Sequence, residues 1–72
     1  MQNFKYTTLE VIKPLLRTGD YILIAEMLKD KYTQQAVEAQ LRGERTLKEP
    51  VVEAVNKLFE LRESLIGTYK NV

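Results

Sequence analysis

Neither cysteine nor histidine occurs in this chain of 72 residues. Disulfide bonds are therefore excluded, and so are thiolate or imidazole metal ligands and Cys or His nucleophiles. Two carboxylates, Glu60 and Glu63, lie three residues apart, but no pocket-forming sequence surrounds them. We therefore expect a protein that is not an enzyme and that binds no metal, no cofactor and no small-molecule ligand.

Long apolar runs are also missing. No stretch approaches the roughly 20 apolar residues that a membrane-spanning helix needs, and the opening residues "MQNFKYTTLEVIKPLL" lack the apolar region of a signal peptide. We therefore expect a cytoplasmic protein with no membrane partner.

The composition is that of an ordinary globular protein, with 44% apolar and 29% charged residues. The length predicts a single domain, 1–72, near the lower size limit at which an apolar core alone supports folding. The net charge is only +1, so the field of the whole molecule gives no strong attraction to nucleic acid. Binding to nucleic acid would need locally placed positive charge.

The first expected helix begins at "TTLEVIKPLL". Thr7 and Glu10 have the spacing of a capping box, and apolar residues follow at helical intervals. We expect this helix to end near Gly19. Pro14 lies inside it and should kink or interrupt it, because proline cannot donate the hydrogen bond to Glu10.

Two short helices are expected next, over about 20–29 and 33–43. Asp20 and Thr33 are their expected N-caps, and Gly43 ends the second where a left-handed residue is commonly needed. The apolar face expected for the first helix consists of Ile22, Ala25, Met27 and Leu28. In the second helix, the residues expected to face inward are Ala36, Val37 and Leu41, and those expected to face outward are Gln34, Gln35, Glu38 and Arg42.

A long last helix is expected over about 50–67, with Pro50 in its first turn. Its apolar residues cover more than one stripe, and three short helices can cover only its first half. Exposed apolar surface of this kind often marks an oligomer interface. The residues expected at a homodimer interface are Leu61, Leu65, Ile66 and Tyr69. The whole assignment is all-α.

The segment 20–43 has the pattern of a helix-turn-helix, in which a second helix with a polar outer face lies in the major groove of DNA. Its "IAEML" and "TQQAVEAQLRG" resemble the motif helices of lambdoid phage repressors, Cro proteins and related bacterial regulators. The match from Thr33 to Gly43 has no gap, and the resemblance covers roughly 19–58. Two features depart from it. The interval from Ala25 to Val37 is longer by two residues and lacks the turn glycine, and Gln40 and Leu41 stand where the pattern usually has a buried aliphatic residue and a freer position.

The resemblance implies a compact four- to five-helix bundle of the lambda-repressor-like type. It also implies base contacts from the first turn of the second motif helix, at Gln34 and Gln35, and from the position of Ala39. A glutamine amide can bond both N7 and N6 of adenine, whereas Ala39 could only touch a thymine methyl. Glu38 would orient a neighbouring side chain or accept from cytosine. Contacts to the DNA backbone are expected from Lys29, Lys31, Tyr32, Thr33, Arg42, Arg45 and Lys48.

The expected function is sequence-specific binding of double-stranded DNA by a small bacterial or phage-type transcriptional regulator associated with the nucleoid. A homodimer would place two recognition helices about 34 Å apart on a palindromic site. The alternative is a helical protein-interaction module of the antitoxin or adaptor kind that binds no DNA, with Gln34 and Gln35 as plain surface residues. The near-zero net charge and the apolar end of the last helix favour this alternative.

Overall fold

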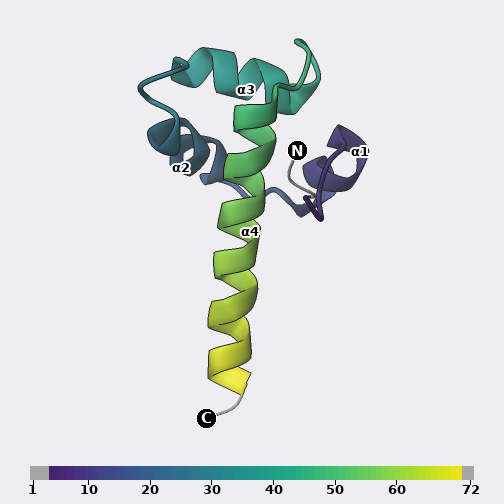
Figure 1. The fold of residues 1–72 in the computed structure, drawn as a ribbon, viewed down its shortest axis with the longest axis vertical. Helices are drawn as coiled ribbons and strands as arrows, with labels where there is room; N and C mark the ends of the chain where they lie inside the picture. Colours follow the sequence, from purple (N-terminus) through teal and green to yellow (C-terminus); the bar gives the residue numbers. More distant parts are fainter. Residues whose placement is uncertain (1–3, 71–72) are drawn as a thin grey trace.

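The computed structural model describes residues 4–70, with side chains up to Leu65. Within these residues all regular secondary structure is helical, as expected. The elements are α1 (Leu9–Ile12), the 3₁₀-helix η1 (Lys13–Leu15), α2 (Asp20–Met27), α3 (Gln34–Arg42) and α4 (Glu49–Lys70) (Figure 1). No described helix is both long enough and apolar enough to cross a lipid bilayer.

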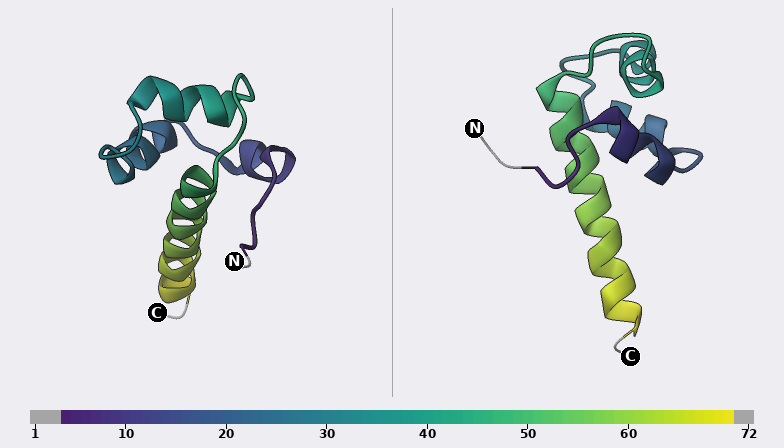
Figure 2. Two further views of the ribbon diagram at one scale, coloured as in Figure 1. Left: turned by 45° about the horizontal axis from the view of Figure 1, so that its top comes forward. Right: turned by 90° about the vertical axis from the view of Figure 1, so that its right-hand side faces the viewer.

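The long helix α4 is the axis of the molecule. Helices α1, α2 and α3 gather around its N-terminal half, and α3 lies across its N-terminal end (Figures 1 and 2). The C-terminal half of α4 projects away from the other helices and gives the molecule principal extents of 41 × 23 × 22 Å. The residues from Glu60 onward are called the stalk below.

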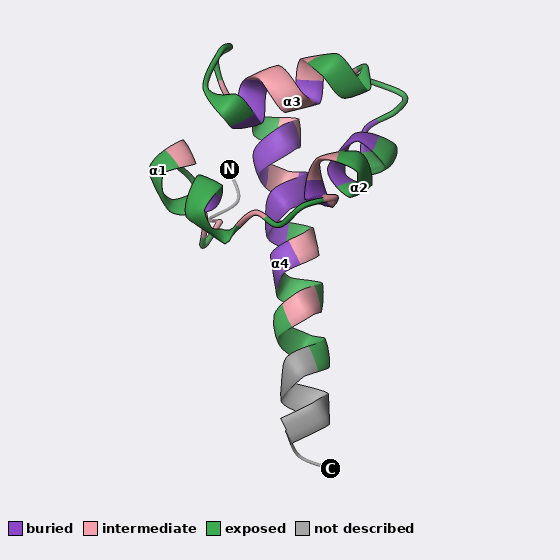
Figure 3. Ribbon diagram, turned by 180° about the vertical axis from the view of Figure 1, so that it is seen from behind, coloured by how far each residue is buried: buried purple, intermediate pink, exposed green. Residues whose placement is uncertain are grey.

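The core lies where the three short helices meet the first turns of α4 (Figure 3). The short helices contribute apolar side chains mainly from one face, because a surface helix needs one buried stripe. The first turns of α4 instead bury Val51, Val52, Ala54 and Val55, which lie on more than one side of that helix. The fully enclosed large side chains are Ile12, Ile24, Val37, Leu41, Val51 and Val55. The stalk residues whose side chains are described, 60–65, contribute no buried apolar side chain to this core. Leu61 and Leu65 are exposed, as expected because three short helices can cover only the first half of α4.

The N-terminal helix is shorter than the sequence predicts. Thr8, and not Thr7, precedes its first residue, and no side-chain cap is formed there, so the expected capping box with Glu10 was wrong. The α-helix ends at Ile12 and continues as one 3₁₀ turn that contains Pro14. Because Pro14 has no N–H to offer Glu10, the interruption expected at this proline occurs and the helix does not reach Gly19.

The face that α2 buries also differs from the expectation. Ile24, Ala25 and Leu28 are buried, whereas Ile22 and Met27 are exposed. Gly19 adopts a left-handed conformation with φ 94° and precedes the helix, so Asp20 is its first residue and not its N-cap. The prediction that Ile22 and Met27 belong to the core was therefore wrong. The bonds of Asp20 described next help to fix the rotation of α2 about its axis.

Asp20 is anchored by two donors from other parts of the chain. Its Oδ2 accepts from the Arg17 backbone N–H at 2.7 Å, and its Oδ1 accepts from Arg62 Nη2 at 2.6 Å. The Asp20 side chain is only 4% exposed, and that of Arg62 is 20% exposed. The guanidinium of Arg62 also lies 5.6 Å from the centre of the Phe59 ring. This buried ion pair joins the start of α2 to the start of the stalk.

An extended segment before α1 packs along the other side of α4. The buried amide of Asn56 accepts from the Tyr6 N–H at 2.9 Å and donates to the Tyr6 carbonyl at 2.7 Å. The Tyr6 ring meets Phe59 edge to face, with centroids 5.0 Å apart. Its hydroxyl donates to Glu63 at 2.5 Å, and Lys5 Nζ lies 3.5 Å from the same carboxylate.

This segment should be sensitive to acid. The Tyr6 hydroxyl, and next the Lys5 charge, hold the pKa of Glu63 below its ordinary 4.5. A carboxyl with a lowered folded-state pKa contributes stability above its unfolded pKa and loses that contribution as the pH falls through the folded one. We expect the NMR signals of the Tyr6 ring to stay constant from neutral pH to about 5 and to shift below it. The Glu63→Gln variant should show no such shift, and an identical titration in both proteins would contradict the role of Glu63.

Candidate nucleic-acid interface

The turn between α2 and α3 is longer than in the family that the sequence resembles, yet it is closed by hydrogen bonds. The backbone N–H groups of Lys31 and Tyr32 both donate to the Leu28 carbonyl, at 2.8 and 2.9 Å. Leu28 is buried, and Tyr32 packs half-buried against the core. The extra length therefore forms an ordered turn that holds α3 against α2.

The N-terminus of α3 is capped as the sequence predicts. Thr33 has extended backbone angles, and its hydroxyl accepts from the Ala36 N–H at 3.1 Å. Gln34 and Gln35 follow in the first turn and are both exposed. This turn contains no acidic residue, so the positive end of the helix dipole is not neutralised there.

The inner face of α3 explains why these two glutamines point outward. Val37 and Leu41 are fully buried, and Gln40 is 4% exposed. The Gln40 side-chain oxygen accepts from the Lys48 backbone N–H at 2.9 Å and so ties the loop after α3 to the helix. The family pattern has a buried aliphatic residue at the position of Gln40, but the bond of Gln40 to Lys48 was not predicted from the sequence, because a glutamine on a polar helix normally indicates surface.

The middle of α3 is partly covered. Glu38 and Ala39 are half-buried, and Ala36, expected to face inward, is also half-buried. Glu38 accepts from Arg42 Nη2 at 3.3 Å, a pair one helical turn apart. Glu38 therefore orients Arg42 in this structure, which is one of the two roles expected for it.

Helix α3 ends at Arg42 and is followed by Gly43, which has φ 89°. The next N–H, of Glu44, donates back to the Ala39 carbonyl at 2.9 Å, as in a Schellman-type ending. A Cβ on Gly43 would lie 3.1 Å from the Leu9 side chain. Both the backbone angle and this close approach favour glycine here.

Basic side chains border α3 at both ends. Lys29 and Lys31 are exposed before it, whereas Arg42, Arg45 and Lys48 are exposed at or beyond its C-terminus. Two of them are already paired, Lys29 with Glu26 at 3.1 Å and Arg42 with Glu38. Within the described part of the chain, no carboxylate lies within ion-pairing distance of the other three.

The structure thus brings together the expected base-contacting and backbone-contacting residues at the α3 end of the molecule. Tyr32 packs partly against the core. The Thr33 hydroxyl accepts the capping hydrogen bond from the Ala36 N–H. Of the expected dimer residues, Leu61 and Leu65 lie on the stalk at the opposite end. The side chains of Ile66 and Tyr69 lie outside the described residues.

Comparisons with known proteins identify no relative of this chain. No protein-family model, no curated protein and no solved structure matches the chain.

Proposed function

We propose that this protein binds double-stranded DNA sequence-specifically through a helix-turn-helix of the lambda-repressor-like type, formed by α2, the turn and α3. The observation that carries the proposal is the first turn of α3, which exposes Gln34 and Gln35 side by side while the opposite face of the helix is buried. In this proposal the protein is a small bacterial or phage-type transcriptional regulator that acts on the nucleoid.

The position of α3 suits a recognition helix. It lies across one end of the molecule, above α2 and the first turns of α4 (Figure 2). The major groove is about 12 Å wide and admits a single α-helix. Because Val37, Gln40 and Leu41 face the rest of the protein, the glutamines can approach base edges while the protein body stays outside the groove.

The chemistry of the exposed side chains indicates which part of the DNA each of them would contact. The amide group of Gln34 or Gln35 offers an acceptor and a donor that match the N6 and N7 groups of adenine. Lys31, Arg45 and Lys48 carry charges free of ion pairs within the described chain and are suited to phosphates. Arg42 would contact a phosphate while its ion pair with Glu38 holds the Arg42 side chain in place.

Selection of bound duplexes from a random pool tests the proposal. We expect an enriched motif that contains A·T pairs at defined positions. The same protein should retain random duplex in a gel-shift titration at low salt and release it as salt is raised. A pool that stays random, together with no salt-sensitive retention, would reject DNA binding.

Lysine substitutions should reveal the phosphate contacts. We expect Lys31→Ala or Lys48→Ala to weaken binding to the selected site and to random DNA alike. Each should lower the slope of log K against log salt by roughly 0.9, the value for one released counterion per phosphate. Lys5→Ala is the matched control, because Lys5 pairs with Glu63 on the stalk side. A slope that changes equally in all three variants would remove Lys31 and Lys48 from the contact surface.

A protein-interaction module is the second candidate. The exposed apolar side chains of α2, Ile22, Leu23 and Met27, favour it, since exposed apolar surface can mark a protein-interaction site. This candidate predicts a protein that shows no retention of duplex at any salt concentration, so the same titration separates the two.

A further inference from the structure

The outward face of α3 carries two exposed polar side chains in one line, Gln35 and Arg42. Gln35 lies two residues before the fully buried Val37, and Arg42 lies two residues after the buried Gln40. A step of two residues turns about 200° around an α-helix, so both side chains lie opposite the buried face. They are seven residues apart, which is close to two full turns and a rise of about 10 Å.

The neighbours of these two side chains on α3 reach out less. Ala39 lies between them along the line and offers a single methyl group, half-buried. Gln34 is seven residues before the fully buried Leu41 and therefore stands at the edge of the outward face. Gln35 and Arg42 are thus the two polar side chains best placed to enter a groove that α3 occupies.

Glu38 sets the direction of the Arg42 side chain. Arg42 Nη2 donates to Glu38 Oε1 at 3.3 Å. Glu38 is one turn nearer to the N-terminus of α3, which is the favoured order for such a pair. The pair draws the guanidinium back along the helix toward Gln35. In a helix-turn-helix the N-terminal part of the second helix contacts base edges, so this direction brings Arg42 toward the bases.

The pair leaves most of the guanidinium free. Arginine has five N–H donors in a rigid fork, and Glu38 takes one of them. Two donors are enough for O6 and N7 of guanine, the commonest specific contact in the major groove. The Glu38 side chain is 24% exposed and that of Arg42 is 55% exposed, so Arg42 meets the DNA first. A carboxylate beside the guanidinium repels a phosphate more than an uncharged base, which favours the base contact.

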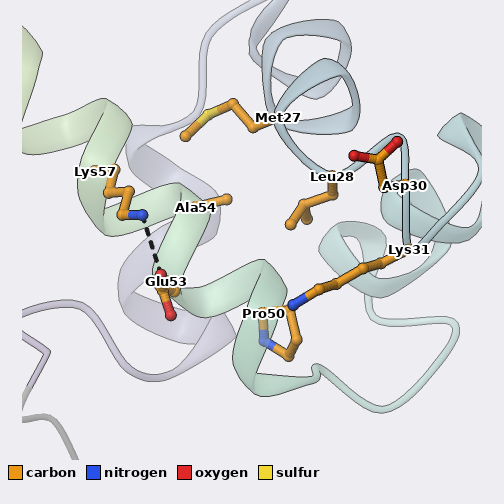
Figure 4. A pocket seen from close by; sticks show the side chains of 8 residues that line it. All are labelled: Met27, Leu28, Asp30, Lys31, Pro50, Glu53, Ala54 and Lys57. Atoms are coloured by element: carbon orange, nitrogen blue, oxygen red, sulfur yellow. Dashed lines mark ion pairs between the residues drawn. The ribbon is translucent and has the colours of Figure 1, made fainter.

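The other basic side chains near α3 lie beside the helix. Arg42 is the single basic residue within α3. Arg45 and Lys48 follow in the loop after it. Lys31 reaches from the turn before α3 toward Pro50, at the start of α4, along a hollow of about 240 Å³ (Figure 4). These flanking positions suit phosphates at the borders of the groove.

We infer that Arg42 reads a guanine about three base pairs from the adenine that Gln35 reads, with Glu38 as the positioning residue of Arg42. The rise of about 10 Å between the two reading side chains equals about three steps of 3.4 Å along one DNA strand. Ala39 between them leaves space for a thymine methyl. This assignment rests on the proposed function and gives Arg42 a base in place of a phosphate.

Arg42→Ala tests the base contact on the duplex selected from a random pool. We expect the selected motif to contain a G·C pair about three base pairs from an A·T pair. Replacing that G·C pair with A·T should weaken wild-type binding at least about tenfold, and binding by Arg42→Ala less than about threefold. A motif without such a G·C pair, or the same loss in both proteins, would overturn the inference.

Arg45→Ala is the matched control. Arg45 is exposed three residues further on and forms no ion pair within the described chain. It should weaken binding to every duplex alike and keep the wild-type preference for the G·C pair. If the two arginine variants lost that preference equally, the effect would not belong to Arg42 and the inference would be wrong.

Glu38→Gln tests the positioning of Arg42. Without the ion pair the guanidinium is free to turn away, so the preference for the G·C pair should fall at least about threefold. Binding to random duplex should stay equal or become tighter, because a negative charge is removed from the surface that faces the phosphates. A variant that bound all duplexes more weakly and kept the preference would remove Glu38 from this role.

These outcomes can be told apart from a failure of the proposed function. If no duplex were retained at any salt concentration, DNA binding would be rejected and the inference with it. If a motif with A·T pairs were selected and Arg42→Ala weakened binding to all duplexes alike, DNA binding would stand and the guanine contact alone would be rejected.

Discussion

Replacing Gln34 and Gln35 together with alanine should reduce affinity for the selected DNA site by about a hundredfold or more, since one bidentate base contact contributes about 1–3 kcal/mol of discrimination. Weak binding to random duplex should remain nearly unchanged, because phosphate contacts supply it. Fluorescence anisotropy with selected and random duplexes measures both affinities.

Gln40→Ala is the matched control on the same helix. Gln40 is buried and bonds the Lys48 N–H, so its loss should lower the free energy of unfolding by about 1–2 kcal/mol. Its effect on DNA affinity should be the same for selected and random duplexes. If the exposed pair also reduced both affinities equally, Gln34 and Gln35 would not be reading bases.

Arg62→Ala should lower the free energy of unfolding by about 3 kcal/mol, because it leaves the buried Asp20 carboxylate without its charged partner. A domain of this length has a total stability of only roughly 4–10 kcal/mol, so the variant should be partly unfolded at moderate temperature. Urea titration followed by circular dichroism measures the loss.

Arg17→Ala is the control for this pair. The Arg17 side chain is exposed, and only its backbone N–H bonds to Asp20, so the variant should change stability by less than about 0.5 kcal/mol. The double variant Asp20→Ala with Arg62→Ala should lose less than the sum of the single changes, because the two residues interact directly. Additive losses would show that the ion pair does not couple α2 to the stalk.

Local interactions explain which parts of the structure the sequence predicted well. The bounds of α3 follow from Thr33 bonding to Ala36 and from the left-handed Gly43, contacts that span a few residues. The interruption at Pro14 follows from one missing N–H. The exposure of Leu61 and Leu65 follows from comparing helix lengths.

Several differences from the sequence predictions concern residues whose partners are far along the chain. Asp20 was read as a local cap, but its charged partner is 42 residues away, and Asn56 bonds to Tyr6 over a separation of 50. Ile22 and Met27 were assigned to the core but are exposed, because no local property of an apolar residue separates a core position from an exposed one. The capping box at Thr7 failed because the helix began one residue later.

By itself, the sequence determined the helical class, the cap and end of α3, and the outward position of Gln34 and Gln35, because periodicity and capping act within one or two turns. Only the tertiary structure decided the rotation of α2 and the burial of Gln40 and Asn56. Those features depend on which distant donor or side chain meets each residue, and that meeting is fixed by the packing of α2 and α3 on α4.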